Sequence, residues 1–202
     1  MPLPSSCSEA MTRSFDAGPG DAPLLEGLPP VVGERTTVLV LGSFPSARSL
    51  AARQYYAHPQ NQFWKILQAI WPARPLPTGA DSYQKRSEWL LERGLGLWDV
   101  YARCRRAGSL DAAIRDAEVN DIAALHLPKL SAIVHNGGES FRHASAVTAH
   151  LSAPSGGSED APGPGVGVRS YRLPSTSPAN ASWSFERKLD AWRTVMSAHG
   201  LA

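Results

Sequence analysis

The chain has 202 residues, enough for one domain with a hydrophobic core, and 43% of them are hydrophobic, as in ordinary globular proteins. A formal net charge of +2 neither indicates nor excludes nucleic acid as a partner, because binding depends on whether cations gather on one face. No apolar run reaches the roughly 18 residues of a membrane-spanning helix, and the N-terminus lacks the features of a secretory signal. We therefore expect a cytoplasmic protein without membrane contact.

Cysteine usage argues against disulfides and against a metal centre. Only Cys7 and Cys104 are present, and Cys7 falls in a segment without recognisable structure. Two cysteines cannot complete a four-cysteine iron–sulfur site, and no paired Cys/His spacing is typical of structural zinc. We expect neither a metal nor another cofactor.

Two segments are rich in Pro, Gly and Ser and show no periodicity. We expect residues 1–34 to be a disordered tail and residues 152–167 to be a flexible surface loop. The folded domain is therefore predicted to span residues 35–202.

Within that domain, short apolar runs that predict buried strands alternate with stretches that predict helices. In chain order, strands are predicted over residues 37–42, 96–100, 131–135 and 168–174, and helices over residues 62–71, 82–93, 119–127, 139–151 and 182–199. Apolar strands joined by helices are typical of a parallel sheet covered on both faces. We therefore predict an α/β fold, with three α/β/α layers around a central four-stranded, mainly parallel sheet.

Ligands of open α/β sheets bind beyond the carboxyl ends of the strands, so the loops that follow the strands form the candidate site. Residues 42–46, Gly-Ser-Phe-Pro-Ser, follow the first strand, and residues 54–64 continue as Gln-Tyr-Tyr-Ala-His-Pro-Gln-Asn-Gln-Phe-Trp. Residues 135–138, His-Asn-Gly-Gly, end the third strand, and residues 175–180, Ser-Thr-Ser-Pro-Ala-Asn, follow the fourth. Aromatic, amide and hydroxyl groups are therefore expected to converge at one edge of the sheet.

These segments resemble motifs of the uracil-DNA glycosylase superfamily. Residues 42–64 are similar to the first motif of the mismatch-specific uracil-DNA glycosylases, a Gly-x-x-Pro-Gly turn followed by an aromatic-Ala-His-Pro-x-Asn-x-Phe-Trp run. Residues 175–180 resemble the second motif, a Pro- and Ser-rich loop near the C-terminus. The Gly-Ser-Phe-Pro turn and the Arg-x-Gly-Ser-x-Asp segment at residues 106–111 are more similar to the hypoxanthine-DNA glycosylase (deoxyinosine glycosylase) branch.

The resemblance covers roughly residues 36–195 and implies a uracil-DNA glycosylase-like catalytic domain. It also implies the activity, a monofunctional DNA glycosylase that excises deaminated bases in base excision repair. Hypoxanthine is the expected base, and uracil is a further candidate. The expected partner is DNA that contains deaminated bases, bound by a monomer.

The candidate catalytic residue follows from a departure from the motif. In the mismatch-specific enzymes a catalytic Asn lies two residues after the motif glycine, where this chain has Phe44, which cannot activate water. The resemblance to the hypoxanthine branch places this role on Asn61, whose amide oxygen can orient a water under the sugar. Asn61 precedes the helix predicted at residues 62–71, so it could instead cap that helix, or do both.

Three residues are expected to bind the extruded base: Phe44, Tyr56 and Asn136. Tyr56 aligns with the aromatic residue that stacks on the base in the mismatch-specific enzymes, and base–aromatic stacking contributes roughly 1–3 kcal/mol. The amide of Asn136 offers the donor and the acceptor that reading a Watson–Crick edge requires. Core packing of Tyr56 and a turn role for Asn136 stay open as alternatives.

Seven residues around these loops are expected to contact DNA through hydroxyl, amide, imidazole or guanidinium groups. They are Ser43, Ser46, His58, Arg106, Ser175, Ser177 and Asn180. Ser177 is the candidate for a phosphate contact, and Asn180 for a group that faces DNA or supports a wedge. The alternatives are structural, namely a histidine bonded to the backbone of its own loop and a turn that caps the last helix.

A local basic cluster could be a DNA contact or a solvated surface, and it consists of Arg93, Arg103, Arg105 and Arg106. Nearby, Ser109 could cap a helix, and we expect Asp111 to be structural. No lysine lies in the three loops, because Lys65 falls on the following helix, so no amine is placed for a Schiff base and no lyase activity is expected.

Three other functions stay open. The first is a uracil glycosylase with little activity on hypoxanthine. The second is a module that binds damaged DNA without cutting it, because Phe44 occupies the usual catalytic position. The third, a hydrolase that uses Ser43 or Ser46 with His58, is disfavoured because the Gly-x-Ser-x-Gly elbow is missing and no carboxylate is evident to orient the histidine.

Overall fold

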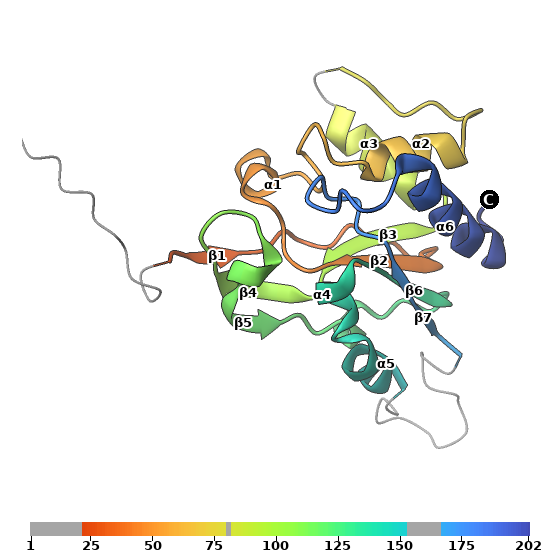
Figure 1. Ribbon diagram of the computed structural model, residues 1–202. Coiled ribbons are helices and arrows are strands. Elements are labelled where there is room, and N and C mark those ends of the chain that lie inside the picture. The colour runs from red at the N-terminus through yellow and green to blue at the C-terminus, as the bar shows by residue number, and fades with distance from the viewer. Residues whose placement is uncertain (1–21, 80–81, 153–166) are drawn as a thin grey trace, which may run out of the picture.

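The computed structural model describes residues 22–79, 82–152 and 167–202. Its centre is a four-stranded parallel sheet in the strand order β3-β2-β6-β7, with helices on both sides (Figure 1). The strands are β2 (Val38–Gly42), β3 (Leu95–Asp99), β6 (Ala132–Asn136) and β7 (Arg169–Leu173). The predicted α/β/α architecture is confirmed, and each predicted strand is correct to within one residue at either end.

Alternation of side chains along β2 divides the interior into two cores. Val38 and Val40 pack with residues of the helices on one side of the sheet, whereas Leu39 and Leu41 pack with residues on the other side. The helices of the first core are α2 (Phe63–Ile70), α3 (Ser82–Leu91) and α6 (Phe185–Ala198). Every residue of β2 is buried, which explains why its sequence is a continuous apolar run.

The helix predicted at residues 119–127 is wrong. β5 (Arg115–Val119) occupies its start, and a single 3₁₀ turn, η2 (Ala123–Leu125), follows. The reason is local, because the side-chain oxygen Oδ1 of Asp121 accepts the backbone N–H groups of Ala123 and Ala124 and so favours a tight turn.

The helix predicted at residues 139–151 is divided into α4 (Gly138–Phe141) and α5 (Ala144–Ser152). At the break, Nε2 of His143 lies 2.8 Å from the Tyr101 hydroxyl oxygen. The short helix α1 (Ala47–Ala52) was not predicted. Among the described residues, no helix has the length and apolar character needed to cross a membrane.

A second, antiparallel sheet in the order β1-β4-β5 was also not predicted. It contains β1 (Leu24–Glu26) and β4 (Tyr101–Arg105), which pair directly. The expected disordered tail is therefore wrong for residues 22–34, which are held by contacts with distant residues rather than by a pattern of their own. Residues 1–21, and residues 153–166 of the expected flexible loop, lie outside the described residues.

The carbonyl oxygen of Leu28 anchors this N-terminal segment to the domain. It accepts hydrogen bonds from the Tyr55 hydroxyl, at 3.1 Å, and from Nε1 of Trp98, at 3.2 Å. The Leu28 side chain is 8% exposed and belongs to the core that contains α2 and α6. The segment therefore contributes to the stability of the domain that carries the site.

We predict that Leu28→Ala lowers the free energy of unfolding by about 2–4 kcal/mol, because it removes a buried aliphatic side chain. Leu24→Ala is the matched control, since Leu24 is 50% exposed in the same segment and its removal should change stability by less than about 0.5 kcal/mol. Chemical denaturation of both variants measures the difference. Equal effects of the two substitutions would mean that the segment does not pack as described.

Candidate active site

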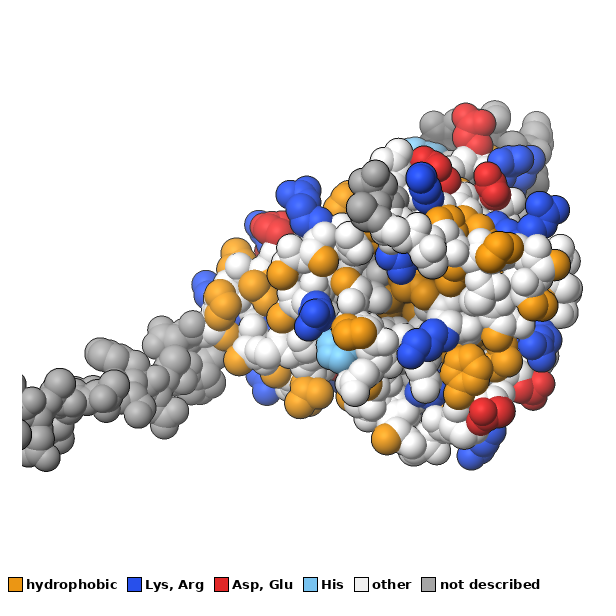
Figure 2. Space-filling view, turned by 90° about the horizontal axis from the view of Figure 1, so that it is seen from above, with side chains coloured by type: hydrophobic (Ala, Val, Ile, Leu, Met, Phe, Trp, Pro, Cys, Tyr) orange, Lys and Arg blue, Asp and Glu red, His pale blue; other side chains and the backbone are white. Residues whose placement is uncertain are grey.

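The loops beyond the carboxyl ends of the parallel strands enclose a hollow of about 420 Å³. This volume lies in the usual range of roughly 300–1,000 Å³ for small-ligand pockets. The face seen in Figure 2 is hollowed near its centre, with hydrophobic, Lys and Arg side chains around the hollow. Nine of the eleven predicted site residues line this pocket, namely Ser43, Phe44, Ser46, Tyr56, Asn61, Asn136, Ser175, Ser177 and Asn180.

The amide of Asn136 joins three of the loops at the pocket. Its Nδ2 donates to the Tyr56 hydroxyl, at 3.1 Å, and to Oγ1 of Thr176, at 3.0 Å. Its Oδ1 accepts the backbone N–H of Thr176 at 2.9 Å. Thr176 is fully buried, and its carbonyl oxygen accepts the backbone N–H of Gln62 just before α2. Both amide hydrogens of Asn136 are thus used within the protein, and one acceptor site on Oδ1 is left.

Tyr56 has one ring face packed on the core and lines the pocket. Its ring stacks on Phe63 with centroids 4.0 Å apart and planes inclined by 25°. Its backbone adopts a left-handed conformation, with φ of 55°, which is unusual for a bulky residue and requires support from its surroundings. The stack on Phe63 and the bond from Asn136 supply that support, so the ring is a fixed wall of the pocket.

Asn61 lies directly before Gln62, the N-cap residue of α2, and lines the pocket. Its Oδ1 accepts the backbone N–H of Phe63, two residues on, at 2.9 Å, so Asn61 fixes the turn that leads into α2 without being the N-cap itself. The backbone N–H of Asn61 donates to the carbonyl oxygen of His58 at 2.8 Å, which fixes the loop before the cap. An amide oxygen has two acceptor sites, so one is left for a water molecule.

A buried carboxyl group, Asp99, lines the pocket where β3 ends. Asp99 is 4% exposed, and its Oδ2 has no hydrogen-bond partner. Oδ1 lies against the backbone of Gly42, where a Cβ would come within 2.3 Å of it, so position 42 has no room for a side chain. Asp99 is a site residue that the sequence analysis does not include, although its position near the end of a predicted strand is a signal for it. Thr176 was likewise missed, because its role depends on contacts between distant loops.

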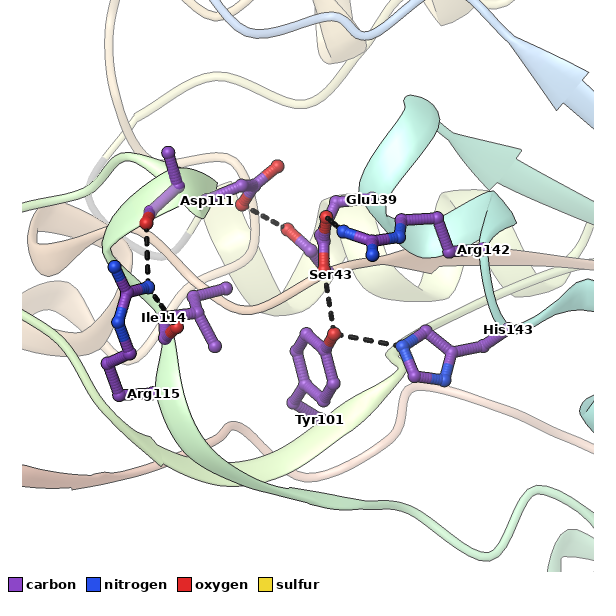
Figure 3. Close-up of polar contacts among 9 residues, drawn as sticks. Ser43, Tyr101, Asp111, Ile114, Arg115, Glu139, Arg142 and His143 are labelled. Atoms are coloured by element: carbon purple, nitrogen blue, oxygen red, sulfur yellow. Dashed lines mark hydrogen bonds and ion pairs between the residues drawn. The ribbon is translucent and has the colours of Figure 1, made fainter.

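Two of the expected DNA-contacting serines stabilise the loop before α1. Oγ of Ser43 donates to Oδ1 of Asp111 at 2.5 Å, so Asp111, which also lines the pocket, holds this loop (Figure 3). Ser46 caps α1, because its Oγ accepts the backbone N–H of Ser49 at 3.2 Å. Oγ of Ser109 accepts the backbone N–H of Ala47 at 3.0 Å, so Ser109 also caps a helix, from a distant loop.

A network of polar side chains connects β4 to α4. The Tyr101 hydroxyl donates to Oε1 of Glu139 at 2.8 Å and lies between it and Nε2 of His143 (Figure 3). Glu139 also pairs with Nη1 of Arg142 at 3.2 Å. Burial and the Glu139 carboxylate raise the pKa of Tyr101, so it stays a neutral donor and holds the two elements together.

The loop at residues 175–180 is internally bonded. Nδ2 of Asn180 donates to the carbonyl oxygen of Ser175 at 3.1 Å, and Oγ of Ser177 accepts the backbone N–H of Ala179 at 3.3 Å. Nζ of the buried Lys188 donates to the carbonyl oxygen of Asn180 at 2.9 Å. The loop is therefore supported from α6, and the hydroxyl group of Ser177 lies at the pocket rim.

Two expected DNA contacts are not at the pocket. His58 does not line it, and its Nδ1 accepts the backbone N–H of Gln60 at 3.2 Å, which is the structural alternative stated for this residue. Arg106 is 1% exposed, so it cannot reach a phosphate, and the prediction of a DNA contact there is wrong. Its guanidinium carbon lies 5.0 Å from the centre of the Phe44 ring, and Nη2 donates to the carbonyl oxygen of Pro45.

The other members of the predicted basic cluster already have partners. Arg93 lies over the Trp89 ring at 3.6 Å, Arg103 pairs with Glu118 at 2.7 Å, and Arg105 pairs with Asp116 at 3.7 Å. These side chains therefore do not form one free basic patch.

Comparison with known proteins agrees with this geometry. The model of the family described as "Uracil DNA glycosylase superfamily" matches residues 29–196. The chain belongs to the uracil DNA glycosylase superfamily. A hypoxanthine DNA glycosylase of Methanosarcina barkeri is 39% identical over 57% of this chain and 72% of its own length, and one of Methanosarcina acetivorans is 34% identical over 84% and 96%. A solution structure of a Methanosarcina acetivorans protein assigned to the uracil DNA glycosylases has a TM-score of 0.69 at 32% identity, covering 88% of this chain and 99% of that one.

Because the chain belongs to this superfamily, the packing of Phe44 bears on which residue can be catalytic. The Phe44 ring is 6% exposed and belongs to the core that contains Leu41 and Tyr101, although it also lines the pocket. An apolar ring held beneath Arg106 has no group that can act on water. Any catalytic amide of this superfamily member must therefore come from elsewhere in the pocket.

The pKa of Asp99 is raised from 3.8 to about 7, chiefly because burial disfavours the charged form, and the negative charge of Asp111 acts in the same direction. The nearby Tyr55 hydroxyl and the positive charge of Arg106 act in the opposite direction on this pKa. The folded protein thus binds the Asp99 proton more tightly than the unfolded chain does. Stability is therefore expected to fall as the pH rises from about 4 to about 7, with the loss complete above the folded-state pKa.

We predict that Asp99→Asn stabilises the protein relative to wild type at pH 8 by about 1–4 kcal/mol and has a much smaller effect at pH 5. The amide cannot ionise, so the variant lacks this pH dependence. Thermal or chemical unfolding from pH 5 to pH 8 measures the difference, with the exposed Asp190→Asn as the control. A stability difference that is the same at every pH would show that Asp99 is not preferentially protonated in the folded state.

Proposed function

We propose that this protein is a monofunctional DNA glycosylase that excises hypoxanthine, with uracil as a second base, by hydrolysing the N-glycosidic bond in base excision repair. The observation that carries the proposal is that Tyr56, Asn61 and Asn136 share one pocket with the buried Asp99. Two Methanosarcina relatives are hypoxanthine DNA glycosylases by name, which supports hypoxanthine as the main base. We further propose that it acts on DNA as a monomer in the cytoplasm.

The pocket fits a base that has been rotated out of the duplex. The ring of Tyr56, supported from behind by Phe63, offers a flat face for stacking. Asn136 positions that ring and the loop at residues 175–180, because both of its amide hydrogens are bonded there. Its remaining acceptor site on Oδ1 can take a ring N–H of hypoxanthine or uracil.

Asp99 is the buried carboxyl group that lines the pocket, and in this function it meets the polar edge of the base. A departing base carries developing negative charge, so an ionised carboxylate at this position would oppose bond cleavage. The raised pKa keeps Asp99 largely uncharged below pH 7, and a neutral carboxylic acid can donate a hydrogen bond to a base oxygen or ring nitrogen. Protonated Asp99 therefore binds the base and stabilises it as it leaves.

Asn61 holds the water that attacks the sugar. The Asn61 side chain has a fixed orientation because its Oδ1 accepts the Phe63 N–H. The same bond therefore fixes the direction of the second lone pair of Oδ1, which can accept a hydrogen bond from water. Because the transition state resembles an oxocarbenium ion, a well-placed water needs little activation. Cleavage then breaks the bond between C1′ and the base nitrogen, and the water oxygen bonds to C1′. Overall, the water loses one proton and the departing base gains one, so the products are the free base and a sugar hydroxyl.

No amine is placed for a lyase reaction. Among the described residues, no lysine lines the pocket, and the nearby Lys188 is buried and donates to the carbonyl oxygen of Asn180. The expected products are therefore a free base and an intact strand with an abasic site.

We predict that excess enzyme releases hypoxanthine from a duplex with a single deoxyinosine faster than it releases uracil or xanthine from matched duplexes. Strand breaks should appear only after alkali treatment. Release of uracil without hypoxanthine would favour the alternative uracil glycosylase. Binding of damaged duplex without release of any base would favour a non-catalytic module.

We predict that Asn61→Ala lowers the single-turnover rate of excision by about 100-fold or more, because the water loses its orientation. The same change removes the bond from the Phe63 N–H, which costs about 1 kcal/mol of stability. Asn61→Ser is the matched variant, since its shorter side chain can still accept that N–H but cannot hold the water in the same place. Loss of rate in both variants, with stability lost only in the alanine variant, is the expected result; near-wild-type turnover of either would contradict the assignment.

A further inference from the structure

Arg106 is a buried arginine that the mechanism described above does not use. Its side chain is 1% exposed, and Nη2 donates to the carbonyl oxygen of Pro45. The other two nitrogens, Nε and Nη1, are buried and have no hydrogen-bond partner. Among the ion pairs of the described residues, none includes Arg106, so its positive charge has no direct counterion.

A buried charge without a counterion lowers the stability of a protein, because burial removes the water that would otherwise surround the charge. Burial lowers the pKa of Arg106, but a guanidinium stays protonated in proteins at neutral pH. The bond to Pro45 does not explain the charge, since a neutral amide could donate the same bond. We therefore looked for a function of the charge itself.

The guanidinium lies directly behind one wall of the pocket. Its central carbon is 5.0 Å from the centre of the Phe44 ring. Phe44 and Pro45 both line the pocket, whereas Arg106 does not. A base in the pocket would therefore be separated from the positive charge by a thin wall that contains an aromatic ring. Such a wall excludes water, so it screens the charge only weakly.

The charge of Arg106 also acts on a group inside the pocket. Burial raises the pKa of Asp99, and the positive charge of Arg106 acts in the opposite direction on that pKa. The negative charge of Asp111 raises it further. The other titratable groups that interact with Asp99 are Tyr55, Tyr56 and Tyr83, which stay neutral because burial raises the pKa of each. Arg106 is thus the cation among the described groups that act on Asp99, where the base is proposed to bind.

The reaction creates negative charge at this place. When the bond between C1′ and the base nitrogen breaks, its electron pair stays with the base, which becomes more negative as it leaves. A fixed positive charge in surroundings of low polarity stabilises such a charge, and it does not have to move during the reaction.

We propose that the buried guanidinium of Arg106 stabilises the departing base electrostatically, across the Phe44 ring and without contact. The inference rests on the proposed glycosylase function, since it requires a base to leave from this pocket. Neutral Asp99 then supplies a hydrogen bond to the base, and Arg106 supplies the positive charge that Asp99 lacks.

Two substitutions separate the charge from the shape of the side chain. Arg106→Gln and Arg106→Lys both shorten the side chain and keep an N–H that can reach toward Pro45, but only lysine keeps the positive charge. Arg169→Gln is the control, because Arg169 is exposed at the start of β7, at the end of the strand remote from the pocket. Thermal unfolding of each variant shows whether it is folded.

The first measurement is single-turnover release of hypoxanthine at pH 6, where Asp99 is largely protonated. We expect Arg106→Gln to lose about 100-fold in rate, which corresponds to about 2.7 kcal/mol. Arg106→Lys should lose less than about fivefold, and Arg169→Gln should match wild type. Equal losses in the glutamine and lysine variants would overturn the proposal, because shape and not charge would then determine the rate.

The second measurement compares uracil with 5-fluorouracil in matched duplexes. Fluorine stabilises the anion of the base, so release of 5-fluorouracil depends less on help from the protein. We expect Arg106→Gln to lose about threefold or more beyond its loss on 5-fluorouracil when the base is uracil, and Arg106→Lys to lose equally on both. Partial unfolding of a variant would lower both rates alike, so an unchanged ratio in Arg106→Gln would contradict the proposal.

The third measurement is the pH dependence of release, which a purely structural role would not change. Loss of the positive charge raises the pKa of Asp99, so the fall in rate at alkaline pH should move to higher pH in Arg106→Gln and stay in place in Arg106→Lys. Release by wild type, with the same pH dependence in both variants, would overturn the role of Arg106 alone. Failure of wild type to release any base would contradict the glycosylase function, and the role of Arg106 with it.

Discussion

The hydrogen bonds of one amide, Asn136, determine how the site is assembled. This side chain leaves the end of β6 and bonds to Tyr56, which follows α1, and to Thr176, which follows β7. Thr176 in turn accepts the N–H of Gln62 before α2. Asn136 is 80 residues from Tyr56 and 40 residues from Thr176 in the sequence, so one set of hydrogen bonds joins three distant segments. Breaking one of these bonds would leave a partly buried donor or acceptor unsatisfied, which is costly, so the arrangement has little freedom.

The pocket contains these hydrogen-bonded polar groups together with one buried polar atom that has no hydrogen-bond partner. Oδ2 of Asp99 is buried without a partner, and Oδ1 faces the backbone of Gly42. Burying a polar group in this way lowers stability, and proteins retain it where it serves a ligand. The raised pKa of Asp99 reduces the cost because the neutral acid is less strongly hydrated than the carboxylate. In the proposed function, base binding therefore depends on the protonation of the same carboxyl group that affects stability.

The sequence predicts best those parts of the molecule that depend on local pattern. The four strands of the parallel sheet were predicted from short apolar runs, and Asn61, Tyr56 and Asn136 do line one pocket. Errors arose where distant contacts override the pattern. The β1 segment has no periodicity of its own and is held by pairing with β4, and Arg106 resembles a surface arginine although it is buried beneath the loop at residues 43–46. Asp99 was visible at a strand end, but only the fold reveals that its carboxyl group is enclosed.

The missing side chain at Gly42 limits how this pocket could acquire a different preference. The volume that a methyl group would fill is taken by the carboxyl oxygen of Asp99, and the Tyr56 hydroxyl would lie 3.8 Å from it. A larger residue at position 42 would displace both the Asp99 carboxyl group and the Tyr56 ring. The shape or polarity of this part of the pocket can therefore change only through a substitution of Asp99, while position 42 stays glycine. Recognition of a new base would thus involve exchanging one buried functional group rather than reshaping the cavity.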